Sequence, residues 1–140
     1  MKIKKVFLDV NIVADIIDSS RATHGDAVGL LQFCIQNDIE VCISEDMLST
    51  LFYISKNREK TLKFFNSVVM IDWTVLPFGK DVITDAIEFS LNKKLDLEDL
   101  LQCFCAKRNG CDILITNDKS FYDCNMEISS CANFLKKEWY

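Results

Sequence analysis

The chain contains 140 residues and carries a formal net charge of −5 at neutral pH. Hydrophobic residues make up 49% and charged residues 26% of the sequence, a composition that excludes intrinsic disorder. The negative charge argues against a protein that holds nucleic acid through a broad basic surface. It does not exclude an acidic site that is neutralised locally by a divalent cation.

Short apolar segments alternate with amphipathic segments along the chain. Runs rich in β-branched and aromatic residues predict strands, and apolar residues spaced by three or four predict helices. In chain order, these patterns predict a strand at 3–8, helices at 11–17 and 24–37, a strand at 39–43, a helix capped by Ser44, an amphipathic segment at 58–69, a strand at 73–76, helices at 80–91 and 97–108, and strands at 113–116 and 126–128.

This alternation predicts an α/β fold, a three-layer α/β/α sandwich with a mostly parallel central sheet. The chain has no repeat and no linker rich in proline or glycine, so we expect a single domain over residues 1–140. In parallel sheets, functional sites lie outside the carboxyl ends of the strands. The residues that follow each predicted strand are therefore the first candidates for a site.

Compartment and cysteine chemistry are also constrained by the sequence. No apolar run approaches the roughly 20 residues of a membrane-spanning helix, so we expect no membrane association. The basic start at 1–5 is not followed by the apolar core of a signal peptide, which predicts a cytoplasmic location. Seven cysteines without a Cys-x-x-Cys pair predict neither a disulfide framework nor a zinc site. We expect reduced thiols that pack as small hydrophobic side chains.

Acidic residues follow two predicted strands and begin one predicted helix. Asp9 follows the first strand, Asp118 follows the strand at 113–116, and Asp96 and Asp99 stand at the start of the helix at 97–108. Because parallel strands end at the same edge of a sheet, we expect these acids to converge there. Carboxylates without histidine or paired cysteine favour Mg²⁺ or Mn²⁺. Crowded carboxylates repel one another unless a cation neutralises them, so the cluster predicts a metal site.

Each acid also has a purely structural interpretation. Asp9, Asp96 and Asp118 all stand where a helix cap or a turn favours an acidic side chain. Asp15 and Asp18, on the first predicted helix, are expected on a solvated face. Asp9, Asp96 and Asp118 are expected to converge at one edge of the sheet, and this joint placement favours the functional interpretation.

Three segments resemble the motifs of the PIN-domain family. They span 7–15, 96–102 and 112–121, and they occur in the family's order. The resemblance extends over essentially the whole chain and is closest to small VapC-type toxins of bacterial toxin–antitoxin pairs. It implies a metal-dependent endoribonuclease that hydrolyses RNA with Mg²⁺ or Mn²⁺, an antitoxin protein as partner, and a homodimer.

The same resemblance implies roles for individual residues. The catalytic, metal-binding acids would be Asp9, Asp99 and Asp118. Asp96 would be an additional metal-binding acid, with Asn11 and Thr116 in supporting positions. The motifs do not identify substrate-binding residues. The basic stretch at 56–63 has the charge to contact RNA phosphates, but a solvated helix face is the favoured interpretation.

One position departs from the family pattern. The family usually carries a further acid about six residues after the serine that begins the helix following the second strand. Counting from Ser44 reaches Thr50, which is not acidic. Glu45 and Asp46 are interpreted as first-turn acids that favour the helix dipole.

This departure leaves alternatives to an active ribonuclease open. One is a catalytically weak or inactive PIN-like domain that serves as an RNA-binding or protein-interaction module. Another is a phosphatase of the haloacid-dehalogenase type, in which Asp9 would be the nucleophile. The phosphatase is disfavoured because its second acid would stand at Asn11.

Overall fold

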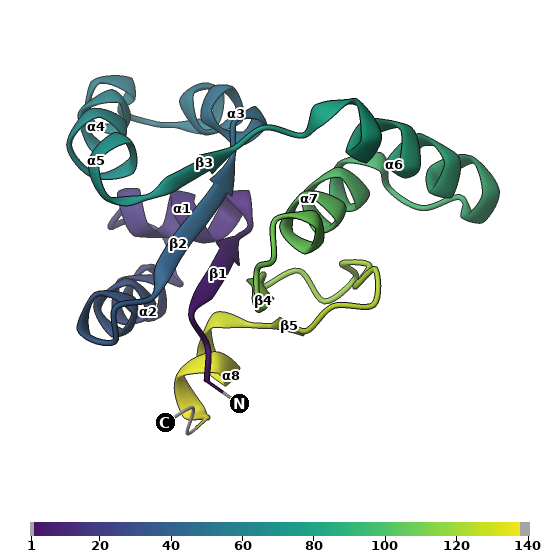
Figure 1. Ribbon diagram of the computed structural model, residues 1–140. Coiled ribbons are helices and arrows are strands. Elements are labelled where there is room, and N and C mark those ends of the chain that lie inside the picture. Colours follow the sequence, from purple (N-terminus) through teal and green to yellow (C-terminus); the bar gives the residue numbers. More distant parts are fainter. Residues whose placement is uncertain (1, 138–140) are drawn as a thin grey trace.

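The computed structural model describes residues 2–137 and contains a five-stranded sheet in the order β3-β2-β1-β4-β5 (Figure 1). Every neighbouring pair of strands is parallel. The strands are β1 (Lys5–Leu8), β2 (Glu40–Ser44), β3 (Thr74–Leu76), β4 (Ile113–Ile115) and β5 (Ile128–Ser129). The central strand β1 is buried on both faces, and its Phe7 is opposite Cys42 on one side and Leu114 on the other. The predicted α/β sandwich is confirmed, with a sheet that is entirely parallel.

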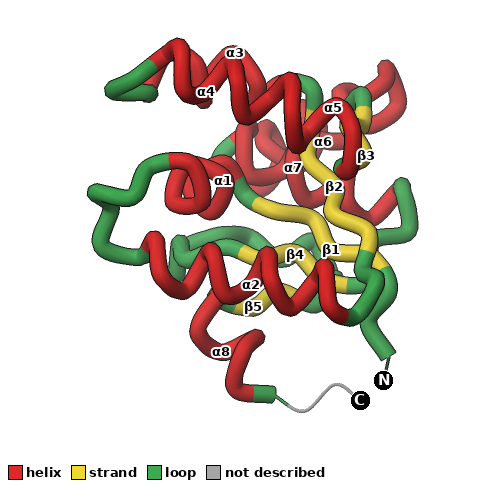
Figure 2. The backbone as a smooth tube through the Cα atoms, turned by 90° about the vertical axis from the view of Figure 1, so that its left-hand side faces the viewer, coloured by secondary structure: helices red, strands yellow, loops and turns green. Residues whose placement is uncertain are grey.

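Helices cover both faces of this sheet. Figures 1 and 2 show α1 and α2 on one side and α6 and α7 on the other. The α-helices are α1 (Val10–Ile17), α2 (His24–Gln36), α3 (Asp46–Ile54), α4 (Arg58–Phe64), α5 (Met70–Asp72), α6 (Gly79–Lys93), α7 (Leu97–Arg108) and α8 (Cys131–Lys136). None of the helices within residues 2–137 is long and apolar enough to cross a membrane.

The order of the strands reverses at β1. From β1 the chain moves outward through β2 to β3, and it then returns through α6 and α7 to place β4 on the opposite side of β1. Connections leaving β1 and β4 therefore diverge, which opens a crevice outside the carboxyl ends of these two strands. The segment after β1 begins with Asp9, whose backbone N–H donates to the carbonyl of Ile115 at 3.0 Å.

Several local predictions are wrong for identifiable reasons. Ser44 does not cap α3; it ends β2, where its buried hydroxyl has no hydrogen-bond partner within residues 2–137. The helical segment at 58–69 changes from α4 to a π-helical turn at Phe65–Val69, and Leu62 is 50% exposed rather than packed. The helix predicted at 80–91 is present as α6, in which only Val82 and Ala86 are buried, because one face packs against α7 and the other meets solvent. The sequence patterns also missed α8.

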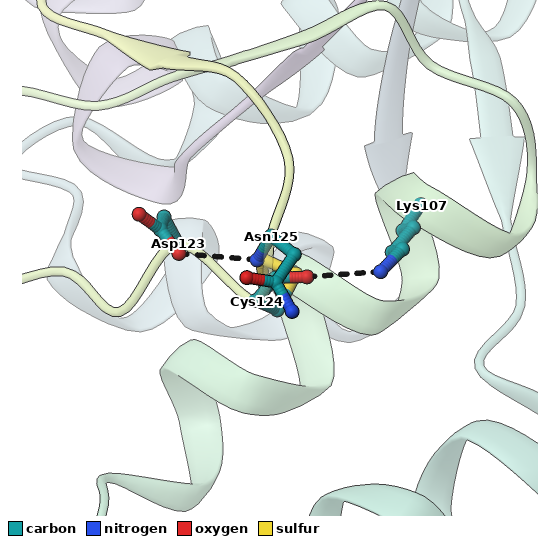
Figure 3. The surroundings of a disulfide bond; sticks show 5 residues. Lys107, Asp123, Cys124 and Asn125 are labelled. Carbon is teal, nitrogen blue, oxygen red and sulfur yellow. Dashed lines mark hydrogen bonds between the residues drawn. A yellow bond between two sulfur atoms is a disulfide. The ribbon is translucent and has the colours of Figure 1, made fainter.

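The cysteine prediction is wrong for one pair. Cys103 on α7 and Cys124 in the segment between β4 and β5 form a disulfide (Figure 3). They lie 21 positions apart, with none of the regular spacing that would mark a pair in the sequence. Beside the bond, Lys107 Nζ donates to the carbonyl oxygen of Cys124 at 3.1 Å. The other five cysteines are free thiols, as expected.

Candidate functional site

A cavity of about 350 Å³ lies outside the carboxyl ends of β1 and β4, and we call it the acidic cavity. Its lining comes from the start of α1 with the residue before it, the start of α7 with the two residues before it, and the segment that follows β4. The lining residues are Asp9, Val10, Asn11, Leu95, Asp96, Glu98, Asp99, Asp118, Ser120 and Tyr122. Five of these side chains are carboxylic acids, and none is a lysine or arginine.

Asp9 is the most buried of these acids, with 9% of its surface exposed. Its Oδ1 accepts from the backbone N–H of Val10 at 2.8 Å, so it caps α1 as the structural interpretation predicted. Its Oδ2 accepts from the Thr116 hydroxyl at 2.8 Å. Burial raises the pKa of Asp9, the bonds from Thr116 and Val10 oppose that effect, and repulsion from Asp118 adds to it. Thr116 thus fixes the orientation of this carboxylate.

Asp118 is held in a turn directly after β4. Its Oδ1 accepts from the hydroxyl of Ser120 at 2.7 Å and from the backbone N–H of Ser120 at 2.9 Å. These bonds lower the pKa of Asp118. Its own backbone N–H donates to the hydroxyl oxygen of Thr116 at 3.1 Å. Thr116 therefore connects Asp9 and Asp118 directly.

The remaining acids come from the start of α7. Asp96 caps this helix, and its Oδ1 accepts from the backbone N–H of Asp99 at 3.1 Å. Partial burial, followed by repulsion from Asp96, Asp118, Asp9 and Glu98, raises the pKa of Asp99 to about 6. The pKa of Glu98 is raised by burial and then by repulsion from Asp46, Asp96 and Asp9. These carboxylates therefore share one electrostatic environment.

The C-terminal half of α1 is anchored by an ion pair that sequence reasoning missed. Asp15 was predicted on a solvated face, but it is buried, with 3% of its surface exposed. Its carboxylate accepts from Arg21 Nε at 2.6 Å and from the hydroxyl of Thr23. Arg21 Nη2 also donates to Asn11 Oδ1 at 3.2 Å. The buried carboxylate thus holds a guanidinium beside the edge of the acidic cavity.

The structure brings the predicted acids and Asn11 to one cavity, with Thr116 behind them. It adds Glu98, which sequence reasoning overlooked because an acid in the first turn of a helix has an ordinary dipole explanation. Thr50 does not line this cavity. Among the described residues, no group of three His, Cys, Asp or Glu side chains is close enough to hold one ion in the present rotamers. The donor chemistry, all hard oxygen ligands without a neutralising cation, nevertheless suits Mg²⁺ or Mn²⁺.

Comparison with known proteins finds a relative in sequence and solved structures of similar fold. Ribonuclease VapC1 of Aquifex aeolicus (strain VF5) is 36% identical to the chain over 141 residues, covering 98% of this chain and 97% of that protein. The fold is similar to that of Mycobacterium tuberculosis VapC20, a sarcin-ricin loop cleaving toxin, with a TM-score of 0.71 and 16% identity over 86% of this chain and 95% of that one.

A second solved structure similar in fold is VapBC2 from Rickettsia felis, bound to a DNA fragment from its promoter. Its TM-score is 0.69 at 19% identity, over 90% of this chain and 98% of that one. The sequence model of the PIN domain matches residues 6–125, which include every acid of the acidic cavity. The family match, the relative aligned along almost the whole chain, and the fold agree that the chain belongs to the PIN-domain family.

Proposed function

We propose that the chain is a divalent-metal-dependent endoribonuclease that hydrolyses phosphodiester bonds in RNA. The observation that carries this proposal is the convergence of Asp9, Asp99 and Asp118 on one cavity where the strand order reverses. The name of the A. aeolicus relative, a ribonuclease, supports the same activity.

Asp9, Asp99 and Asp118 would hold Mg²⁺ or Mn²⁺, with Asp96 as an additional ligand. When bound, the ion would orient the phosphate, stabilise charge on it and activate a water molecule. Thr116 fixes the rotamer of Asp9 by donating to Oδ2, and it supports the backbone of Asp118. The hydrogen bonds from Ser120 lower the pKa of Asp118 and fix the position of its Oδ1.

The biological role that we propose is that of a toxin held by an antitoxin protein. Support comes from solved structures of similar fold, which include a toxin–antitoxin complex from Klebsiella pneumoniae (TM-score 0.69, 16% identity) as well as VapBC2. The homodimer and the cytoplasmic location that the sequence suggested stay predictions.

The decisive experiment compares wild type with Asp118→Asn and with Asp85→Asn, an exposed acid on α6 outside the cavity. Each protein is titrated calorimetrically with Mn²⁺ and incubated with a pool of random-sequence single-stranded RNA. We expect metal binding and cleavage in wild type and Asp85→Asn, and loss of both in Asp118→Asn. Cleavage that survives equally in both variants would reject the proposal.

A second candidate function is a PIN-like module that binds RNA or protein without catalysis. Thr50 favours this function, because the position is not acidic. The described residues also contain no group of three His, Cys, Asp or Glu side chains placed to hold a metal ion. The same experiment separates the two. Folded wild type that shows neither Mn²⁺ binding nor cleavage would support the module, whereas cleavage abolished by Asp118→Asn would exclude it.

A further inference from the structure

A second cavity, of about 150 Å³, lies one to two helical turns along α1 from the acidic cavity. It is bounded by α1, α3 and the start of α4, and Figure 2 shows α1 between α2 and the pair α3–α4. Ala14, Ile17, Leu51 and Ile54 contribute apolar surface to it. We call it the cationic cavity because its polar lining includes three basic side chains and one carboxylate, namely Arg21, Lys56, Lys60 and Asp18.

The two cavities share one structural link. Arg21 lines the cationic cavity, and its Nη2 donates to Asn11, which lines the acidic cavity. Asn11 and Ala14 are three residues apart on α1, which corresponds to about 4.5 Å along the helix axis. A single strand of RNA that passes the carboxylates is therefore within reach of the neighbouring cavity.

Size and chemistry define what this cavity accepts. A cavity of roughly 150 Å³ with an apolar lining accommodates one six-membered aromatic ring such as benzene. Beside the apolar surface, Ser55 and the buried Thr61 hydrogen-bond to each other through their hydroxyls at 2.6 Å. The side-chain carbonyl of Asn57 accepts from the backbone N–H of Lys60, and its NH₂ group has no hydrogen-bond partner among the described residues. An amide NH₂ is a donor suited to the carbonyl oxygen of a base.

The basic side chains around the ring-sized space match a phosphate backbone. The carboxylate of Asp18 is hydrogen-bonded within its own turn, because its Oδ1 accepts from both the backbone N–H and the hydroxyl of Ser20. Lys56 Nζ lies 3.4 Å from the Ser20 hydroxyl, and Arg21 is fixed by Asp15. A nucleotide combines an aromatic ring with a phosphate, and this cavity combines an apolar space with cations at its edge.

We propose that the cationic cavity binds a pyrimidine nucleotide of the RNA strand, with the base among Ile17, Leu51 and Ile54 and the phosphate at Lys56 and Lys60. This proposal rests on the ribonuclease function and adds to it a substrate preference. A purine has two fused rings, and its second ring would extend beyond the space that one ring fills and lose apolar contact there. The preference thus comes from the size of the cavity, and the affinity from apolar contact with the base and attraction of the phosphate by the lysines.

The test measures RNA binding rather than cleavage. All proteins carry Asp118→Asn so that the strand stays intact, and binding of labelled six-nucleotide oligo(U) and oligo(A) is followed by fluorescence anisotropy in Mg²⁺ at several salt concentrations. Lys60→Gln removes a cation that lines the cavity. Lys63→Gln is the matched control, because Lys63 lies on the same helix, pairs with Glu59 at 3.0 Å and does not line the cavity.

We expect oligo(U) to bind roughly tenfold more tightly than oligo(A). Lys60→Gln should lower the slope of log K against log salt by about 0.7, the value for one phosphate contact on a single strand, and Lys63→Gln should not change it. Ile54→Trp, which fills the mouth of the cavity, should abolish the preference for oligo(U). In a parallel measurement, 4-thiouridine in the oligomer should cross-link to peptides from 14–21 or 51–61.

The outcomes separate this proposal from the ribonuclease function. If Lys60→Gln and Ile54→Trp bind both oligomers as Lys63→Gln does, the cavity does not bind RNA and the proposal is wrong, whether or not wild type cleaves RNA. If the expected preferences and cross-links are found but wild type shows no metal-dependent cleavage, the nucleotide site stands and the ribonuclease function falls. Circular dichroism confirms that each variant is folded before it is measured.

Discussion

The acidic and cationic cavities lie close together along α1 and carry opposite charge. The first is lined by five carboxylic acids, whereas three cations and one carboxylate line the second. The net charge of −5 for the whole chain does not indicate that one cavity is acidic and the other basic. A phosphodiester strand is repelled by the first region unless a cation is bound there, and it is attracted by the second. In the function that we propose, the acidic cavity carries out the chemistry and the cationic cavity retains the substrate. Each of the following experiments changes one region and leaves the other intact.

The largest effect is expected from Asp9→Asn, which changes the most buried acid of the cavity. Supporting residues of metal sites typically account for about 10- to 100-fold in affinity or activity, so loss of a ligand should lower kcat by more than about 100-fold. Because the cationic cavity is unchanged, the Kd for oligo(U) should stay within about twofold of wild type. A variant that loses RNA binding in proportion to kcat would show that the two regions do not act separately.

The disulfide provides a second way to distinguish the regions. Cys103 and Cys124 connect α7 to the segment after β4. Together with the capping residue Asp96, these two elements provide four of the five acids. No residue of the cationic cavity lies on either element. A loop of this length predicts a loss of about 3 kcal/mol in the free energy of unfolding when the bond is reduced.

Urea denaturation with and without dithiothreitol measures this loss, and Cys103→Ala/Cys124→Ala is the internal control because reductant should not change its stability. Cleavage should fall on reduction, while the preference for oligo(U) should persist. An unchanged unfolding midpoint of wild type in reductant would refute the expected contribution of the disulfide.

Thr116→Val should have the next largest effect. It removes the donor to Asp9 Oδ2 and the acceptor of the Asp118 backbone N–H while it preserves side-chain volume. We expect Mn²⁺ affinity to fall by about 10- to 100-fold by calorimetry. Thr84→Val on α6 is the matched control, since that hydroxyl donates only locally to the carbonyl of Lys80. Equal affinities in the two variants would contradict the orienting role of Thr116.

The sequence was sufficient to predict the sheet and the main acids because both depend on local patterns. Apolar strands and helical spacing identify nearly every element, and acids that directly follow parallel strands must share an edge of the sheet. Asp9 and Asp118 are therefore predictable. Asp15 was misinterpreted because a carboxylate on an amphipathic helix is usually exposed, and its partner Arg21 lies beyond the end of that helix.

Features that depend on tertiary packing were not predictable. The disulfide requires α7 and the segment after β4 to approach each other, and no spacing rule relates Cys103 to Cys124. The cationic cavity combines residues from α1, α3 and α4, and the basic stretch at 56–63 gives no indication that Lys60 lines a cavity whereas Lys63 pairs with Glu59. Helix periodicity identifies a face, but it does not identify what that face meets.

The smallest expected effect is a change in the stability of Asp99→Asn, which tests the repulsion among the carboxylates of the acidic cavity. Burial and neighbouring carboxylates raise the pKa of Asp99 from 3.8 to about 6 in the folded protein. Between these values the folded state binds more protons than the unfolded state, so this group lowers stability as the pH rises from about 4 to about 6. The destabilisation is fully present at neutral pH and is relieved by acid or by a bound cation.

Because Asp99 is partly solvated, screening reduces the effect to about 1 kcal/mol. Asp99→Asn should therefore unfold at higher urea than wild type at pH 7.5 without divalent cation, and the difference should disappear near pH 4. Mn²⁺ should stabilise wild type more than the variant. Asp85→Asn, outside both cavities, should show neither effect. Equal stability of Asp99→Asn and wild type at pH 7.5 would mean that the carboxylates of the acidic cavity repel one another too weakly to favour a bound cation. The electrostatic difference between the two cavities would then not be supported.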